Sequence, residues 1–174
     1  MMGKNISIIG FMGTGKSAIG RNVAGELDFK FIDLDRYIEK NLGMTIREYF
    51  STYGEREFRK IEQFYLGEVL NNDDKQVIST GGGIVLLDEN RKLLKDQSYV
   101  VSLKANAKTI YYRIKRNNKR PLLRTQKPLK AINQLMKERK GLYDFGDVSF
   151  YTDSETIIEL ARKIAQTYRD HLLD

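Results

Sequence analysis

The stretch GFMGTGKS, residues 10–17, matches the phosphate-binding pattern G-x-x-x-x-G-K-[ST] without a deviation. It follows an apolar run and precedes a segment with helical spacing, which is the context that this pattern requires. Its glycines let backbone N–H groups turn towards a phosphate, Lys16 adds a charge near the β- and γ-phosphates, and Ser17 offers a hydroxyl to Mg²⁺. The alternative, a glycine-rich turn with an incidental lysine, is disfavoured by both flanks.

Two carboxylates follow the second apolar run, which ends in FIDLD. If the run is a strand, Asp33 and Asp35 project from its carboxyl end on the same face, because side-chain direction repeats every two residues. Beside a magnesium triphosphate, one could hold the metal through water and the other could orient or deprotonate an attacking hydroxyl. The alternative is a pair of N-cap carboxylates that open a helix at Arg36.

The segment GEREFRKIEQF places Glu55 four residues before Arg59 and Glu62 three residues after it. On a helix both acids can flank the guanidinium and hold it in a fixed pose for bidentate binding of a carboxylate or phosphate. A solvated ion pair worth a few tenths of a kcal/mol is the alternative. Arg139, in KERKGLY, is ambiguous by itself.

Three consecutive glycines, Gly81 to Gly83, follow a β-branched run in VISTGGGIVLL. Ordering them is entropically costly, so we expect a tight turn in which bare backbone lets a small ring approach an N–H group.

A cation-rich stretch, RIKRNNK, begins at Arg113 and leads into RPLLR. It lacks interleaved aromatic residues, so a solvated helix end before a lid over the phosphates explains it at least as well as nucleic-acid binding does.

The composition limits the chemistry that the chain can perform. It has 174 residues, a net charge of +7 and no cysteine, which excludes thiolate chemistry and suits a reducing cytoplasm. Its one histidine, His171, lies three residues from the C-terminus, so we expect carboxylates to do any acid–base work. No apolar run approaches the roughly 18 residues of a membrane span, and no signal peptide is expected.

Strand-like and helix-like segments alternate along the whole chain, which predicts an open α/β sheet of parallel strands covered by helices, with ligands beyond the carboxyl ends of the strands. The predicted strands are Asn5–Ile9, Lys30–Leu34, Gln76–Ser79, Tyr99–Leu103 and Val148–Thr152. The predicted helices are Ser17–Leu27, Arg36–Leu42, Thr45–Asn71 with a break near Gly54, Asn90–Lys95, Ala107–Asn117, Pro128–Tyr143 and Glu155–Leu172, the last with Asp153 and Ser154 as candidate N-caps.

Taken in order, GFMGTGKS, DLD, FRKIE, STGGG, RPLL and RKGLY resemble the motifs of the shikimate kinase family over nearly the whole chain. That resemblance implies a three-layer α/β/α P-loop kinase with a five-stranded parallel sheet in the order 2-3-1-4-5. It also implies transfer of the γ-phosphoryl group of MgATP to the 3-hydroxyl of shikimate, in aromatic amino-acid biosynthesis. Residues 1–174 would form one domain, with a substrate-binding segment at about 35–62 and a lid at about 114–127.

The resemblance also assigns roles to individual residues. Lys16, Asp35 and Arg120 would be catalytic, with Asp35 as the base and Arg120 reaching the phosphates from the lid. The residues expected to bind ATP are Gly13, Thr14, Gly15, Lys16, Ser17, Ala18, Arg113 against the adenine, and Arg120. The residues expected to bind shikimate are Asp35, Arg59, Gly81, Gly82 through its N–H, and Arg139. Ser17 and, through water, Asp33 would hold Mg²⁺.

Two other functions stay open on the sequence alone. One is a kinase of the same fold for gluconate, a nucleotide or another small metabolite, and the other is a non-catalytic nucleotide- or nucleic-acid-binding module that uses the positive charge. The pair Ser79–Thr80 stands where many P-loop proteins have a metal-binding aspartate, which disfavours motors and switches. We expect a cytoplasmic monomer that binds neither nucleic acid nor a membrane.

Overall fold

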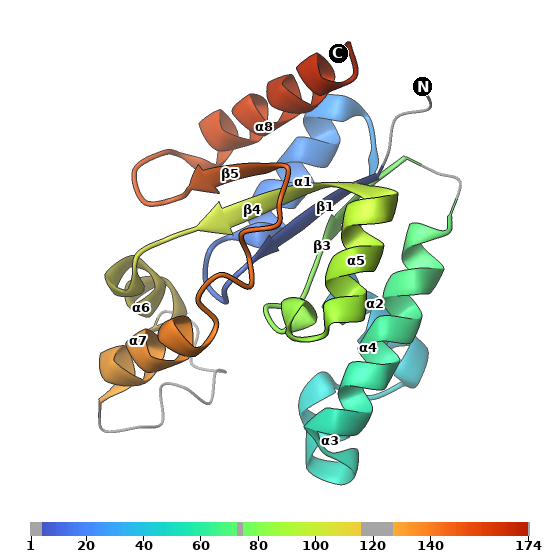
Figure 1. Cartoon of the computed structure of the whole chain (residues 1–174), viewed down its shortest axis with the longest axis vertical. Helices are drawn as coiled ribbons and strands as arrows, with labels where there is room; N and C mark the ends of the chain where they lie inside the picture. The colour runs from blue at the N-terminus through green and yellow to red at the C-terminus, as the bar shows by residue number, and fades with distance from the viewer. Residues whose placement is uncertain (1–4, 73–74, 116–126, 174) are drawn as a thin grey trace.

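A parallel sheet forms the centre of the computed structural model, which describes residues 5–72, 75–115 and 127–173 (Figure 1). The strands run in the order β2-β3-β1-β4-β5, and every neighbouring pair is parallel. They are β1 (Asn5–Gly10), β2 (Lys30–Asp33), β3 (Gln76–Ser79), β4 (Ser98–Lys104) and β5 (Val148–Tyr151). All five strands and their order confirm the prediction, with ends shifted by one residue at most.

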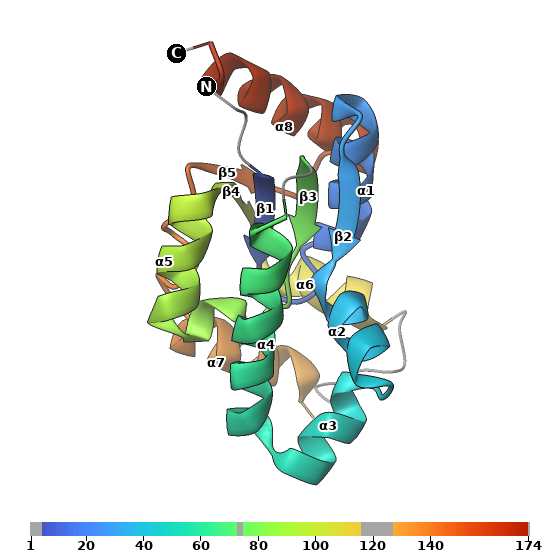
Figure 2. The ribbon, with the colours of Figure 1, turned by 90° about the vertical axis from the view of Figure 1, so that its right-hand side faces the viewer.

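Helices connect the strands and cover both faces of the sheet (Figure 2). They are α1 (Lys16–Leu27), α2 (Leu34–Leu42), α3 (Ile46–Tyr53), α4 (Glu55–Leu70), α5 (Asp88–Gln97), α6 (Ala107–Lys115), α7 (Pro128–Glu138) and α8 (Ile157–His171), with a short 3₁₀ helix, η1, at Ile84–Leu86. The predicted break at Gly54 is confirmed, because this glycine has φ 83° between α3 and α4. Among the residues described, no helix is long and apolar enough to cross a membrane.

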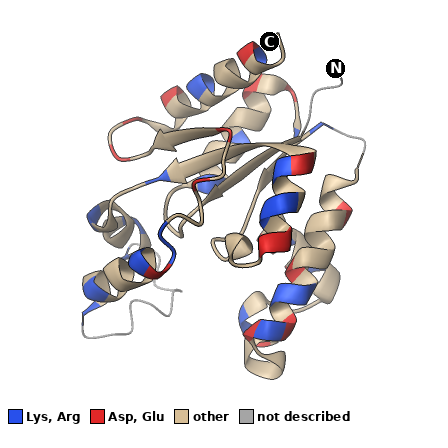
Figure 3. Ribbon diagram, in the orientation of Figure 1, with Lys and Arg blue, Asp and Glu red and all other residues tan. Residues whose placement is uncertain are grey.

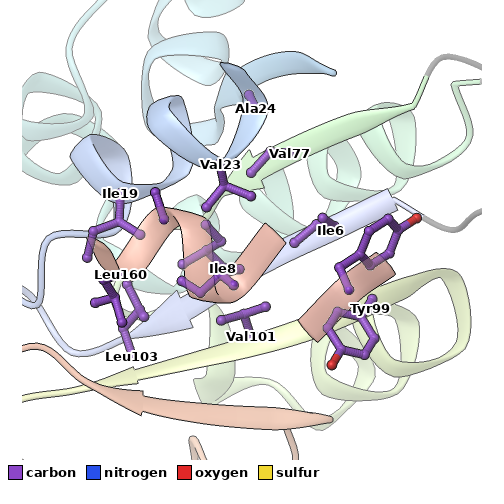
Figure 4. Packing of buried hydrophobic residues seen from close by; sticks show 13 residues of the cluster. Ile6, Ile8, Ile19, Val23, Ala24, Val77, Tyr99, Val101, Leu103 and Leu160 are labelled. Atoms are coloured by element: carbon purple, nitrogen blue, oxygen red, sulfur yellow. The ribbon is translucent and has the colours of Figure 1, made fainter. Parts of the chain in front are cut away.

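One apolar cluster joins the sheet to α1 and α8. Ile6 and Ile8 point from β1 into this cluster, where they meet Val23 of α1 and Leu160 of α8 (Figure 4). These side chains are at most 1% exposed, so burying each one contributes about 1.5–3 kcal/mol.

A second cluster fills the opposite face. Ile9, the next residue along β1, points away from Ile8 and packs with Leu66 of α4 and Leu94 of α5. Because both faces of the sheet are covered, all six residues of β1 are buried, including the polar Asn5 and Ser7. This rigid central strand leads directly into the phosphate-binding loop.

Helices α6 and α7 pack together beyond the carboxyl ends of the strands (Figure 1). Ile110 and Ile114 of α6 and Ile132 of α7 are buried there against Phe11. The predicted helix Pro128–Tyr143 is too long, because α7 ends at Glu138 and the chain turns at Gly141, where φ is 82°. The predicted extension of α6 to Asn117 lies partly outside the described residues.

The start of α8 differs from the prediction. Thr156, not Asp153 or Ser154, is the N-cap: it accepts the backbone N–H of Glu159, whose carboxylate accepts in return from the Thr156 backbone. The carboxylate of Asp153 is already occupied, because it accepts from the backbone and side-chain amides of Asn106. The capping box of Thr156 and Glu159, and not Asp153, therefore sets the start of α8.

Charges of both signs are interspersed on the surface. Lys and Arg alternate with Asp and Glu along α5 and α8 in Figure 3. This pattern is typical of a solvated helical surface, and it disfavours one continuous basic face on these two helices.

Candidate active site

One cavity of about 460 Å³ combines most of the predicted nucleotide-binding residues with predicted acceptor-binding residues. It opens where β1 passes into α1, at the carboxyl edge of the sheet. Its lining consists of Met12, Gly13, Gly15, Lys16, Ser17, Ala18, Asp35, Thr80, Gly82 and Arg113. Residues separated by up to 101 positions in the chain therefore face the same volume.

The loop between β1 and α1 has the backbone that a phosphate cradle requires. Gly13 and Gly15 have φ values of 77° and 97°, a region that residues with a Cβ rarely adopt. A Cβ on Gly13 would also lie 3.0 Å from Cγ2 of Ile114. Thr14 between them is buried, and its hydroxyl donates to the carbonyl of Phe11 at 2.8 Å.

The side chain of Lys16 extends back over this loop and is only 8% exposed. Its ammonium donates to the carbonyl oxygens of Gly10 at 2.9 Å and Phe11 at 3.0 Å. The charge therefore lies over the loop, where the N-terminal end of α1 adds a second positive contribution.

The hydroxyl of Ser17 lies 3.2 Å from that of Ser79, at the end of β3. Asp33 is the register partner of Ser79 in the neighbouring strand. A hydroxyl and one nearby carboxylate fit Mg²⁺, which keeps several waters and takes its other ligands from substrate phosphates. Among the described residues, no group of three or more His, Cys, Asp or Glu side chains is placed to hold a metal ion.

Asp33 and Asp35 do not share one face of a strand, and that expectation was wrong. Strand β2 ends at Asp33, which acts as the N-cap of α2 and accepts the backbone N–H of Arg36 at 3.3 Å. Helix α2 begins at Leu34, two residues before the expected start, so Asp35 lies in its first turn. The period-two rule no longer applies there, yet this turn brings Asp35 into the cavity.

The predicted clamp around Arg59 is present. Its guanidinium donates to Glu55 at 2.8 Å and to Glu62 at 2.7 Å. The side chains of Arg59 and Glu62 are only 14% and 1% exposed, so a solvated surface pair is the wrong description. Burial alone would lower the pKa of Arg59, but Glu62 and Glu55 outweigh burial and raise the pKa, so the guanidinium stays charged. The two hydrogen bonds hold it in one position.

Glu62 links this arginine to Asp35. Burial raises the pKa of Glu62 above its ordinary value, Arg59 opposes the shift, and the negative charge of Asp35 adds to it. Burial is therefore the main cause of the raised pKa, and the neighbouring carboxylates of Asp35 and Glu55 add to it.

The three consecutive glycines face three different neighbours. A Cβ on Gly81 would lie 2.8 Å from Oδ1 of Asp35, and one on Gly83 would lie 2.5 Å from both terminal nitrogens of Arg59. A Cβ on Gly82 would lie 3.2 Å from the backbone nitrogen of Met12, in the phosphate loop. Asp35 and Arg59 therefore both lie against this turn.

Arg139 approaches the same turn from the other side. It donates to the carbonyl of Gly82 at 3.1 Å, and its guanidinium lies 5.7 Å from the ring centroid of Phe11. The phenol of Tyr143 donates to that carbonyl as well, at 2.7 Å. Tyr143 ends the RKGLY motif and was not among the predicted site residues.

Arg113 fastens the phosphate loop to the end of β5. It donates to the hydroxyl of Thr152 at 2.7 Å and to the Thr152 carbonyl, and to the carbonyls of Gly13 and Thr14 at 3.4 and 3.3 Å. A neighbouring cavity of about 240 Å³ extends from this arginine towards Glu155. Arg120 lies outside the described residues.

Comparisons with known proteins point to one family. The family model for shikimate kinase matches residues 12–169. A shikimate kinase from Thermodesulfovibrio yellowstonii is 44% identical over 95% of each chain. A shikimate kinase from Acinetobacter baumannii, solved in complex with shikimate, is 33% identical over 99% of this chain and 97% of that one, with a TM-score of 0.92.

A likeness to another kinase is confined to the fold. A gluconokinase from Sinorhizobium meliloti 1021 is 15% identical over 97% of this chain and 93% of that one, with a TM-score of 0.61.

Proposed function

The chain belongs to the shikimate kinase family, and from that premise we propose how its own residues divide the work of the reaction. The reaction transfers the γ-phosphoryl group of ATP to the 3-hydroxyl of shikimate and gives shikimate 3-phosphate and ADP, within aromatic amino-acid biosynthesis. The enzyme is thus an ATP-dependent phosphotransferase with an alcohol acceptor.

The phosphates of ATP bind to the backbone amides of Gly13, Thr14, Gly15, Lys16, Ser17 and Ala18. The ammonium of Lys16 exchanges its two loop carbonyls for phosphate oxygens and offsets the charge that builds up during transfer. Arg113 and the adjoining cavity near Thr152 receive the nucleoside, and Arg120 reaches the phosphates.

Ser17 and, through water, Asp33 hold Mg²⁺ in this proposal. The ion would supply positive charge that reduces the negative charge that the acceptor meets. The proximity of Ser17, Ser79 and Asp33 supports this assignment.

Shikimate lies between the two fixed arginines. Arg59 and Arg139 bind its carboxylate with charge-assisted hydrogen bonds, while the Gly82 N–H and the backbone at Gly81 contact its ring substituents. Asp35 accepts the proton of the 3-hydroxyl as the oxygen forms its bond to the γ-phosphorus and the bond to the β-phosphate oxygen breaks. Most of the remaining rate acceleration comes from holding the 3-hydroxyl and the γ-phosphoryl group in a reactive geometry.

The observation that carries the assignment of the phosphate site and the base is the cavity in which Lys16, Ser17, Asp35 and Gly82 face one volume. A phosphate donor bound to the loop would lie directly beside the proposed base. We further propose that residues 1–174 act as one cytoplasmic, monomeric kinase domain that binds neither nucleic acid nor a membrane. Residues 35–62 form its acceptor-binding segment and residues 114–127 its lid.

A coupled ADP-release assay tests the function. With MgATP and shikimate the protein should turn over well above its ATPase background, and with gluconate or a nucleoside monophosphate it should not. Lys16→Ala serves as the control for contaminating kinases and should abolish the signal. Equal background rates with all three acceptors would exclude the proposed acceptor.

A further inference from the structure

Tyr143 contacts the turn that holds the acceptor-binding glycines. Its ring packs between two apolar clusters, and its phenol donates to the carbonyl of Gly82 at 2.7 Å. Burial raises the pKa of this phenol, although the hydrogen bond from Arg139 acts to lower it. The phenol therefore keeps its proton at neutral pH and remains a donor.

The carbonyl of Gly82 belongs to the central peptide of a β-turn. Ile84 N–H closes this turn by donating to the carbonyl of Gly81 at 3.2 Å, so Gly82 and Gly83 are the two central residues. Gly83 has φ −95° and ψ −2°, which are the values of a type I turn. A type II turn differs mainly by a flip of the central peptide, and glycine at the second central position permits it.

Gly82 and Gly83 have no side chains that could favour the type I turn over the type II turn. Two donors bind the Gly82 carbonyl and favour the observed state: the Tyr143 phenol, and the Arg139 guanidinium at 3.1 Å. Together they occupy both lone pairs of this oxygen. A flip would leave both donors without that acceptor, which disfavours the flipped state.

The conformation of the Gly81–Ile84 turn affects the positions of both Arg139 and Arg59. Arg139 lies 3.5 Å from the phenol oxygen and shares its acceptor, so the phenol sets where this guanidinium rests. Gly83 lies against Arg59, and a change in its φ would alter that contact.

We propose that Tyr143 is a positioning residue that locks the Gly81–Ile84 turn in one peptide state and fixes Arg139 beside it, ready for the acceptor. The proposal rests on the proposed function, because it takes Arg59, Arg139 and Gly82 as the acceptor site. Tyr143 acts through these groups and need not touch the substrate.

Tyr143→Phe is the test, because it removes the hydroxyl and keeps the ring in its packing. Loss of one net hydrogen bond should raise the KM for shikimate about fivefold to tenfold, with kcat within about threefold and the Kd for ADP within about twofold. The matched control is Tyr99→Phe, which alters another buried phenol in the core cluster between the sheet and α8, and it should leave all three constants unchanged. An unchanged KM for shikimate in Tyr143→Phe, or an equal loss of shikimate and ADP affinity, would overturn the proposal.

Amide signals of ¹⁵N-glycine-labelled protein separate positioning from direct contact. Without shikimate, Tyr143→Phe should shift or broaden the signals of Gly82 and Gly83 and leave those of Gly13 and Gly15 in place. Unchanged signals together with a raised KM would mean that the phenol touches the acceptor itself, which contradicts the proposal. The signals themselves need no turnover, so unchanged signals of Gly82 and Gly83 would overturn the locked turn even if wild-type protein fails to phosphorylate shikimate.

Discussion

Replacing Gly83 with alanine probes the acceptor site through one contact. The backbone at Gly83, with φ −95° and ψ −2°, accepts alanine without strain, so the substitution acts only through what the new methyl group meets. That methyl group would lie 2.5 Å from both terminal nitrogens of Arg59 and 2.7 Å from its Cζ. Ordinary contacts begin near 3.4 Å, so the guanidinium must retreat by about 1 Å.

Arg59 cannot retreat freely, because Glu55 and Glu62 hold it at 2.8 and 2.7 Å. If it binds the carboxylate of shikimate, a displacement of this size weakens or removes a charged hydrogen bond worth about 1.5–3 kcal/mol. The expected result is a decrease of about 10- to 100-fold in kcat/KM for shikimate. The Kd for ADP should stay within about twofold, because the new methyl group meets Arg59 first and Arg59 does not line the cavity at the phosphate loop.

Steady-state kinetics with shikimate varied at saturating MgATP measure the effect, and calorimetry measures ADP binding. Gly67→Ala is the matched control: it lies on α4 with Arg59, and its Cβ would meet nothing within 4 Å. It should leave kcat/KM unchanged and stabilise the fold by up to about 1 kcal/mol. A folded Gly83→Ala enzyme with kcat/KM within twofold of wild type would refute the role given to Arg59.

Three further predictions address other parts of the molecule. Asp35→Asn should lower kcat by about 10²- to 10⁴-fold and leave the Kd for ADP nearly intact, and an unchanged kcat in the ADP-release assay would remove Asp35 as the base. Arg139→Ala should mainly raise the KM for shikimate, by roughly 10-fold or more, and a loss confined to kcat would contradict carboxylate binding. Hydrogen bonds from Thr156 lower the pKa of Glu159, so the stability they contribute is present above its ordinary pKa and is lost as pH falls through the lowered value. Glu159→Gln should therefore unfold at a lower temperature than wild type at pH 7 in calorimetry, with the difference closing below about pH 4, and a constant difference would exclude this linkage.

The phosphate loop and the Arg59 clamp could be predicted because each depends on local spacing. Residues three or four apart on one helix must be neighbours, so Glu55, Arg59 and Glu62 needed no tertiary information. The alternation of strands and helices likewise implied a parallel sheet, whereas the strand order came from the resemblance.

The predicted starts of helices α2 and α8 were wrong, because more than one residue there can act as the N-cap. In FIDLD the strand pattern and the capping preference of aspartate overlap, and capping at Asp33 prevailed, which moved Asp35 from a strand onto a helix. At α8 a threonine paired with Glu159 outcompeted the earlier Asp153, because a tertiary contact with Asn106 had already engaged that carboxylate. No local pattern reports such a contact.

The bond between Tyr143 and Gly82 could not be read from the sequence at all. It joins residues 61 positions apart, and it forms because α7 ends at Glu138 and the chain then turns back towards the glycines. The tyrosine was visible within RKGLY, four residues after Arg139, but only the fold shows that both donate to one carbonyl.

A crystal structure with shikimate and ADP bound tests the proposed acceptor site most directly. The shikimate carboxylate should lie within hydrogen-bonding distance of Arg59 and Arg139, and the 3-hydroxyl should lie within about 3 Å of an Asp35 oxygen. Shikimate bound with its carboxylate away from both arginines, or with its 3-hydroxyl out of reach of Asp35, would contradict the proposed division of roles.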